Sequence, residues 1–269
     1  MKSIINSLVV AFSMYSKIPM PGADWNRENM RYSMCFFPWI GLVIGIIEYL
    51  WILISFRAGF SALFAASVFT VIPILITGGI HMDGYLDTCD AMSSWREKAR
   101  RLEILKDSNA GAFAVIYGAV YFILYLGAAS VLVSWPLTHA SEGVAGMPGA
   151  ALMMAAAFVV SRSLSAFSVV SFPHANPDGT AAKFGDEAQG RTVRITSICY
   201  LTAAAVWCVC INPPAGFGMI LAAMLSFVFY HHFCMKYFGG MTGDLAGFFT
   251  CICELACLLE IIAAGTFAV

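Results

Sequence analysis

Long apolar stretches dominate this chain, and short polar segments separate them. A helix that spans a bilayer needs about 20 mostly apolar residues. Seven stretches approach that length: residues 37–56, 59–80, 112–134, 147–171, 195–211, 216–234 and 245–268. None shows the two-residue alternation of a membrane β-strand, and helices are the other way to satisfy backbone hydrogen bonds in lipid. The pattern therefore predicts an all-α fold, a polytopic transmembrane helix bundle with about seven spans.

The composition agrees with a membrane protein. Of the 269 residues, 60% are hydrophobic and only 12% are charged, with a mean hydropathy of +0.79. Soluble domains carry roughly a quarter charged residues, so this chain lacks the charge that a surface exposed to water requires. Its net charge of −1 shows no basic excess, and we expect no nucleic-acid partner. Most of the nine cysteines lie in apolar stretches, where cysteine behaves as a small hydrophobe rather than a metal ligand.

The Lys and Arg residues predict the orientation in the membrane. With seven spans, four segments share one side: 1–36, 81–111, 172–194 and 235–244. They hold all but two of the 15 Lys and Arg residues, Arg57 falling on the other side and Arg162 within a span. The positive-inside rule places that side in the cytoplasm. We therefore expect a multi-pass protein of the cell (inner) membrane with a cytoplasmic N-terminus. Residues 1–269 form one integral membrane domain, in which 1–36 is a retained interfacial or re-entrant segment.

A row of aspartates follows the second apolar stretch. Asp83, Asp87 and Asp90 are spaced i, i+4 and i+7, which on a helix places them on one face within two turns. Three like charges this close repel one another unless a cation neutralises them, and Mg²⁺ prefers carboxylate and phosphate oxygens. Gly84 leaves room for a ligand to approach the backbone. A hydrated acidic loop is the alternative. Because Asp244 also lies at a membrane boundary, in a chain with only 16 acids, a magnesium site is favoured.

The segment before the third apolar stretch combines a cation with a carboxylate. Lys106, Asp107 and Ser108 come shortly before Gly111, where that stretch begins. A lysine and a carboxylate there could hold a phosphate and a second metal, as in other phosphoryl-transfer sites. The basic residues in 96–100 are more typical of an amphipathic surface helix that faces anionic headgroups.

Two further polar segments lie at membrane boundaries. Residues 172–186 are rich in Pro and Gly and are predicted as a loop. That loop, which includes Lys183, is equally consistent with a substrate-contacting lid and with an ordinary hydrated connection. The other segment carries Thr242, Gly243 and Asp244 directly before the last apolar stretch.

Charged residues within the spans are a separate group. Glu48, Arg162 and Glu254 all fall inside predicted spans. Charges in lipid are costly and are functional candidates by default. A structural pair between Arg162 and a glutamate and a substrate-binding role both remain open.

Taken in order, these motifs resemble the cobalamin synthase family, the adenosylcobinamide-GDP ribazoletransferases. The resemblance covers essentially the whole chain, and the combined set is specific where single pieces are not. Tyr85, Cys89 and Met92 depart from the expected small or aliphatic residues without removing a candidate ligand. The matching stretches are Ser16-Lys17-Ile18-Pro19, Phe37-Pro38-x-x-Gly41, Gly78-Gly79-x-His81-x-Asp83-Gly84-x-x-Asp87-x-x-Asp90, Arg101-x-x-x-x-Lys106-Asp107-Ser108-x-x-Gly111 and Gly239-Gly240-x-Thr242-Gly243-Asp244.

The resemblance implies a reaction and roles for the residues. Such an enzyme joins α-ribazole, or its 5′-phosphate, to adenosylcobinamide-GDP, releases GMP and forms adenosylcobalamin or its phosphate. Asp83, Asp87 and Asp90 are expected to hold Mg²⁺. Lys106 would contact a diphosphate oxygen, and Asp107 or Asp244 would add a ligand or orient the nucleophile. His81 is a candidate general base, although an aspartate could serve. Substrate contacts are expected at Gly79, Gly84, Ser108, Lys183, Thr242 and Gly243.

Two other functions compete with this interpretation. A CDP-alcohol phosphotransferase-like lipid enzyme also places aspartates at membrane boundaries, but its signature fails after Asp83-Gly84, where Tyr85-Leu86-Asp87 follows. A secondary transporter would place its binding groups near the bilayer midplane, whereas the densest polar clusters here lie at the surface. All matched motifs fall on the predicted cytoplasmic side, so the active site is expected there. The partners are then the small-molecule substrates and membrane lipid, and the sequence leaves open whether the chain forms a homo-oligomer.

Overall fold

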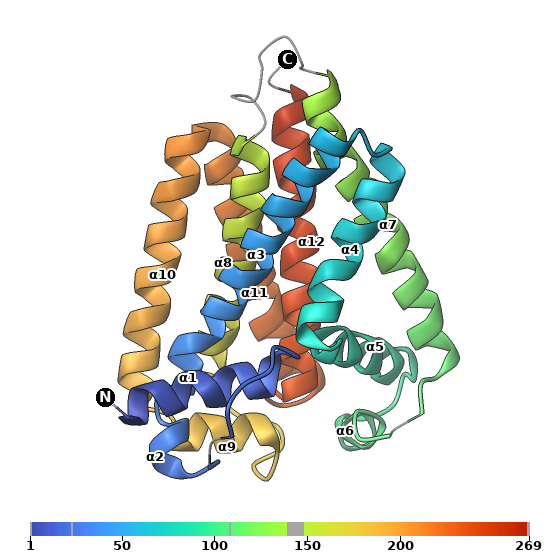
Figure 1. Cartoon of the computed structure of the whole chain (residues 1–269). Coiled ribbons are helices and arrows are strands. Elements are labelled where there is room, and N and C mark those ends of the chain that lie inside the picture. Colours follow the sequence, from blue (N-terminus) through green and yellow to red (C-terminus); the bar gives the residue numbers. More distant parts are fainter. Residues whose placement is uncertain (1, 23, 108, 139–147, 268–269) are drawn as a thin grey trace.

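The computed structural model describes residues 2–22, 24–107, 109–138 and 148–267. Within them, the extended pairing is limited to one isolated bridge between His174 and Met241. In these described ranges, six helices are long and apolar enough to cross a membrane, which confirms the all-α transmembrane bundle (Figure 1). They are α3 (Ser33–Ala58), α7 (Ala112–Thr138), α8 (Pro148–Val169), α10 (Gly190–Ile211), α11 (Pro213–Tyr237) and α12 (Gly243–Phe267).

The remaining predicted span is a broken one. Helix α4 (Ala62–Thr77) meets α5 (Ile80–Ser93) at an angle of 96°, and the pair qualifies as a crossing only together. The predicted stretch 59–80 ends at Thr77 because Gly78 and Gly79 have φ angles of +66° and +80°, and a helix commonly ends at such a left-handed glycine. After this bend, α5 runs across the end of the bundle (Figure 1).

Short helices gather at the same end of the bundle as α5 (Figure 1). They are α1 (Lys2–Tyr15), α2 (Arg27–Met30), α6 (Lys98–Ile104) and α9 (Thr180–Glu187). Helix α1 is apolar but, with 14 residues, shorter than the spanning helices. The loop predicted over 172–186 is wrong in its second half, because α9 forms there and buries Ala182 and Phe184. Helix α10 begins at Gly190, earlier than the predicted 195.

Two helices form the centre of the bundle. The apolar windows of α8 and α12 are 67% and 61% buried, whereas that of α10 is 17% buried and faces outward. Helix α3 packs directly on α8, because Gly41 and Gly45 present no side chain where the α8 backbone passes at Phe158 and Ala155. Small residues give membrane helices this close approach. The two central helices also carry Arg162 and Glu254.

Candidate active site

Helix α5 places the aspartate row at the end of the bundle. Asp83, Asp87 and Asp90 share one face, as the spacing predicts, and the opposite face is buried. At Gly84 a side chain would collide with the backbone of Asp244. The expectation that Gly84 leaves room for a ligand is therefore wrong, because α12 fills that space. Gly84 instead brings the first turn of α12 against the acidic helix.

Carboxylates from three parts of the chain converge on this row. The pKa of Asp87 rises from its ordinary 3.8 to about 7, first because the side chain is partly buried and then because of the negative charges of Asp83, Asp244, Asp90 and Asp107. Like charges raise a carboxyl pKa only when they lie close to it. The structure thus unites residues that the sequence separates by more than 150 positions.

Asp90 has a second role that sequence reasoning missed. Its carboxylate accepts the backbone N–H groups of Gly111 and Ala114, the latter at 3.0 Å. These are groups at the N-terminus of α7, which otherwise lack partners. Asp90 therefore caps α7 and fixes the start of that helix relative to α5.

Asp107 lies in the turn that leads into α7. It accepts hydrogen bonds from the backbone N and the side-chain Nδ2 of Asn109, at 3.0 and 2.9 Å. These bonds lower the pKa of Asp107, so the carboxylate stays ionised. Ser108, predicted to contact substrate, lies outside the described residues.

The glycine loop before α12 is held in place by the segment before α9. Met241 N–H donates to the Pro173 carbonyl at 2.8 Å, and Ala175 N–H donates to the Met241 carbonyl at 3.0 Å. Thr242 then caps α12, because its Oγ1 accepts the Leu245 N–H at 3.2 Å. The two backbone bonds fasten the segment at Pro173 and Ala175 to the loop before α12.

A cavity of about 280 Å³ opens between α6 and α9, and we call it the α6–α9 cavity. It brings together Lys106, Thr242, Gly243 and Asp244, all predicted as site residues. Its other lining residues are Leu102, Leu105, Asn176, Gly179, Thr180, Ala181 and Met241. Asn176 and Thr180 were not predicted as site residues, although they lie in the Pro- and Gly-rich segment 172–186 for which a substrate-contacting lid was one of two interpretations.

A larger cleft of about 560 Å³ opens between α1 and the α4–α5 bend, and we call it the α1 cleft. Gly79 and Asp83 line it together with Lys17, which sequence reasoning did not assign to the site although the Ser16-Lys17-Ile18-Pro19 motif pointed there. The backbone N–H of Lys17 donates to the Ile76 carbonyl at 2.7 Å. The lysine side chain packs over Gly78, so α1 is fastened to the bend.

Two predicted site residues lie apart from the aspartate row. His81 is buried, and its ring packs near Tyr15 and Phe37 at centroid distances of 6.4 and 5.6 Å. It stands about 200° around the helix from Asp83, at about 100° per residue, and so faces the bundle interior. Lys183 is exposed on α9 and lines neither the α6–α9 cavity nor the α1 cleft.

The basic residues of α6 hold that helix to the end of α11. Lys98 Nζ and Arg101 Nη1 donate to the carbonyls of Met235 and Tyr237, both at 3.4 Å. Cations favour such helix C-termini. Arg100 instead pairs with Glu103 at 2.5 Å. The expected surface helix is thus present, but part of its charge binds protein rather than facing headgroups.

The carboxylates suit a cation whose remaining ligands come from water and from substrate phosphates. Among the described residues, no three His, Cys, Asp or Glu side chains form a ready-made metal cage. Mg²⁺ usually binds through one or two carboxylates, with waters and substrate phosphates completing its shell. The repulsion around Asp87 shows negative charge that a cation would relieve, so the residues present fit Mg²⁺ bound together with a phosphate.

The charged residues within the membrane form a pair. Arg162 Nη1 and Glu254 Oε1 lie 2.6 Å apart, and Ser161 Oγ donates to the same oxygen at 2.9 Å. Both charged side chains are almost fully buried. The structural pair that the sequence left open is therefore present.

Comparisons with known proteins agree with the motifs. The model of the cobalamin-5-phosphate synthase family matches residues 7–263. A protein of Lachnoclostridium phytofermentans named adenosylcobinamide-GDP ribazoletransferase is 44% identical over 260 residues, covering 97% of this chain and 94% of the relative. Proteins of the same name from Rhizobium etli and Clostridium botulinum strain Alaska E43 are 30% and 28% identical, covering 94% and 97% of this chain and 95% and 98% of theirs. No solved structure matches the chain. The chain belongs to the cobalamin-5-phosphate synthase family.

Proposed function

We propose that this protein is a Mg²⁺-dependent adenosylcobinamide-GDP ribazoletransferase. It joins α-ribazole, or its 5′-phosphate, to adenosylcobinamide-GDP and releases GMP. The observation that carries the proposal is the convergence of Asp83, Asp87, Asp107 and Asp244 beside Lys106. An acidic site with one adjacent lysine is what transfer of a diphosphate-linked group requires, and relatives that match nearly the whole chain carry this name.

In this proposal Asp83 and Asp87 hold Mg²⁺ together with the substrate diphosphate. Asp90 serves mainly as the cap of α7, because both of its oxygens already accept backbone N–H groups. When bound, Mg²⁺ would neutralise negative charge on the diphosphate and on the GMP that leaves.

The protein side chains bind the diphosphate and move one proton. Lys106, exposed in the α6–α9 cavity, donates to a diphosphate oxygen. Asp244 accepts the proton of the attacking ribose hydroxyl, a role for which His81 faces the wrong way. The hydroxyl oxygen forms a bond to the phosphorus nearest the cobinamide. The bond from that phosphorus to the bridging oxygen of GMP breaks, and GMP leaves as a phosphate monoester.

The two openings beside α5 divide the substrate between them. The α1 cleft is the larger and mixes Met14, Ile74 and Phe122 with polar groups, which suits the methyl- and amide-bearing rim of a corrinoid. The α6–α9 cavity is half that volume and is lined by Lys106 and Thr242, which suits the nucleotide end. The aspartates of α5 then lie beside the diphosphate that joins the two parts.

We place this site on the cytoplasmic face of the inner membrane. Helices α1, α5, α6 and α9 lie at one end of the bundle, and α12 ends at the other (Figure 1). The segments 1–36, 81–111, 172–194 and 235–244, which include these short helices, hold 13 of the 15 Lys and Arg residues, and this favours the cytoplasm for that end. A reporter enzyme that is active only outside the cytoplasm, fused after α12, should be active. An inactive reporter on a folded protein would contradict the orientation.

The function is tested with purified protein in liposomes. Adenosylcobinamide-GDP and α-ribazole 5′-phosphate are added, and GMP release is followed with Mg²⁺ or with EDTA. We expect GMP only with Mg²⁺, strongly reduced release from Asp83→Asn, and normal release from Asp186→Asn, which removes an exposed acid outside both cavities.

Each failure identifies a different part of the proposal. GMP release that persists in EDTA would refute the metal dependence but not the reaction. Full activity of Asp83→Asn would refute the ligand assignment. Folded wild-type protein that releases no GMP from either α-ribazole or its phosphate would refute the function.

A further inference from the structure

The α1 cleft holds an unpaired lysine on the side of α5 where Asp83 lies. Lys17 and Asp83 both line this cleft, and among the described residues around it Lys17 is the one cation. The lysine side chain is exposed. In the described part of the chain, its ammonium group forms no salt bridge, with Asp83 or with any other residue, and no hydrogen bond. Its positive charge is therefore available to a ligand.

Two contacts hold Lys17 in this position. Its backbone N–H donates to the Ile76 carbonyl at 2.7 Å. Its aliphatic stem crosses Gly78, where any side chain would collide with Cγ, Cδ and Cε of the lysine. A lysine side chain loses much rotamer freedom when a ligand fixes it. Because the stem already packs on the α4–α5 bend, part of that loss precedes binding.

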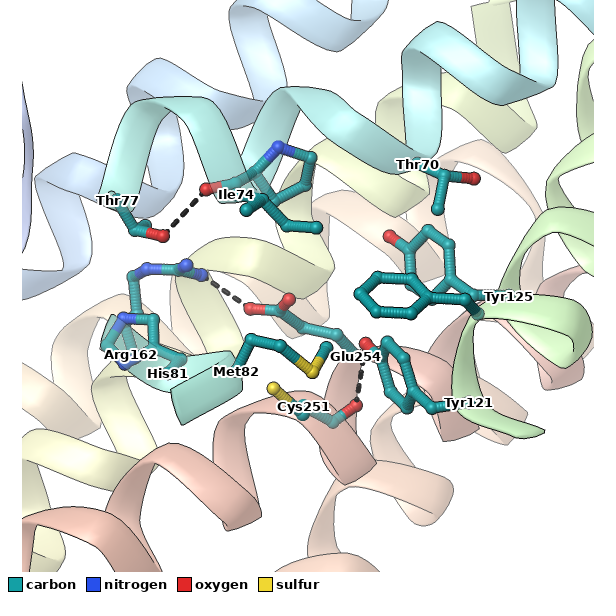
Figure 2. A pocket seen from close by; sticks show the side chains of 12 residues that line it. Thr70, Ile74, Thr77, His81, Met82, Tyr121, Tyr125, Arg162, Cys251 and Glu254 are labelled. Carbon is teal, nitrogen blue, oxygen red and sulfur yellow. Dashed lines mark hydrogen bonds and ion pairs between the residues drawn. The ribbon is translucent and has the colours of Figure 1, made fainter. Parts of the chain in front are cut away.

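Two of the three hydroxyl groups that line the cleft are already hydrogen-bonded. Ser16 Oγ donates to the Phe12 carbonyl at 2.7 Å. Thr77 Oγ1 donates to the Pro73 carbonyl, also at 2.7 Å, and Figure 2 shows this bond as a dashed line from Thr77. A charged donor makes stronger hydrogen bonds than a neutral one. Lys17 is thus the strongest donor that the cleft offers.

A phosphate in this cleft needs a cation from the protein. In the proposed function the corrinoid lies in the cleft, and its phosphate reaches the aspartates of α5. A phosphate beside Asp83 is repelled by that carboxylate, and a lysine attracts it as a compact point charge. Lys106 belongs to the α6–α9 cavity, whose described lining shares no residue with that of the cleft. The cation on the corrinoid side is therefore Lys17.

We propose that Lys17 binds the phosphate that stays attached to the cobinamide. This inference rests on the proposed function, which supplies the corrinoid and its diphosphate. The ammonium group of Lys17 donates to a non-bridging oxygen on the phosphorus nearest the cobinamide, and Lys106 contacts the phosphate that leaves with GMP. Each lysine is then tied to one half of the substrate, and this separation can be measured.

The first test measures binding of the two halves without turnover. Purified protein in detergent with Mg²⁺ is titrated with adenosylcobinamide phosphate or with GMP, and the rise in melting temperature gives each affinity. Lys17→Met should weaken binding of adenosylcobinamide phosphate about tenfold, the value of one charged hydrogen bond in a site open to water. Its affinity for GMP should stay near wild type. Lys106→Met should show the reverse pattern.

Two further variants separate charge from structure. Lys17→Arg keeps the charge and should retain most of the affinity for adenosylcobinamide phosphate. Lys236→Met removes an exposed lysine that lines neither opening and should bind both ligands like wild type. Without ligand, Lys17→Met should melt at the wild-type temperature. Methionine keeps an unbranched stem over Gly78, and the bond to Ile76 involves only the backbone.

A lipid headgroup presents the same phosphate chemistry, because anionic lipids attract lysines at the membrane surface. Wild-type protein and Lys17→Met are therefore also compared in phosphatidylcholine liposomes with and without phosphatidylglycerol. We expect phosphatidylglycerol to change the melting temperature of both proteins equally. If it stabilises only the wild type, and both proteins bind adenosylcobinamide phosphate equally, Lys17 binds lipid and the inference is overturned.

Two other outcomes also overturn it. One is equal affinity of wild type and Lys17→Met for adenosylcobinamide phosphate. The other is a lower melting temperature of unliganded Lys17→Met together with equal weakening of both ligands, which would give Lys17 a structural role. Failure of the proposed function looks different, because folded wild-type protein would then release no GMP from adenosylcobinamide-GDP.

Discussion

Charge is used in opposite ways in two regions of this molecule. At the centre of the bundle, Arg162 and Glu254 pair at 2.6 Å and are almost fully buried. At its end, partial burial and the negative charges of four other aspartates raise the pKa of Asp87 to about 7. Within the described residues, no salt bridge involves those aspartates. A charge in lipid must be neutralised within the protein, whereas like charges next to water can persist until a ligand neutralises them. Charge is therefore paired at the structural centre of the bundle, and repulsion is left unrelieved where we propose the binding site.

The largest expected effect comes from breaking the central pair. Arg162→Met leaves Glu254 buried without its partner and should lower the free energy of unfolding by about 3–5 kcal/mol. The measurement is unfolding of the detergent-solubilised protein in a denaturant series. Because an uncharged replacement of both partners avoids the orphaned charge, Arg162→Met with Glu254→Leu should recover most of the loss. A double variant as unstable as the single one would show that the pair is not the cause.

Removing a charge from the aspartate row should leave stability unharmed and lower turnover instead. Asp87→Asn removes a repelling charge, so metal-free protein should melt at the same or a higher temperature than wild type. Turnover should nevertheless fall about 100- to 1,000-fold, the effect of removing several kcal/mol of charge stabilisation. Asp186→Asn is the matched control. Reduced stability together with normal turnover would make Asp87 a structural residue like Arg162.

The pH of the solution should change both stability and Mg²⁺ affinity at the end of the bundle through Asp87. Because its folded-state pKa is raised from 3.8 to about 7, the folded state holds this proton more tightly than the unfolded state does. The contribution of Asp87 to the stability of the metal-free protein is therefore fully present below its ordinary pKa of 3.8 and is lost as pH rises from there to about 7. Mg²⁺ competes with that proton and should bind about tenfold more tightly at pH 8 than at pH 6. Binding is measured by the Mg²⁺-dependent shift in melting temperature, and Asp87→Asn should flatten the dependence.

The smallest effect should come from Asp90, which caps α7 and also belongs to the aspartate row. Asp90→Ala removes the cap of α7 and should lower stability by about 1 kcal/mol. Asparagine also caps helices, so Asp90→Asn should restore most of that stability and keep turnover within a few-fold of wild type. Thermal unfolding and GMP release test the pair of variants. Turnover lost equally in both variants would return Asp90 to the metal ligands.

Local spacing predicted the acidic helix correctly. The i, i+4, i+7 pattern of Asp83, Asp87 and Asp90 is a property of any α-helix, and the structure confirms it. The same geometry could have placed His81 on the opposite face, because two positions along a helix turn by about 200°. The sequence contained that information, but His81 was grouped with the aspartates because it belongs to the same motif.

Long-range geometry could not be read from the sequence. The Gly78-Gly79 pair was visible, but the 96° bend it allows depends on how α5 packs against α12. Arg162 and Glu254 are 92 positions apart, and Glu48 was an equal candidate as the partner. The meeting of Asp107 and Asp244 at Asp87 likewise needs the complete fold, since no local pattern relates these segments.

The fastening of Lys17 to the α4–α5 bend has a consequence for biosynthesis. Lys17 is translated before α4, so its backbone donor has no partner at Ile76 until that later helix has entered the membrane. The bend is therefore secured only when an early segment returns to a later one. A bulky tag fused ahead of α1 that displaced this segment would impair the site without touching any aspartate. Expression vectors for this protein should therefore place no bulky tag ahead of α1.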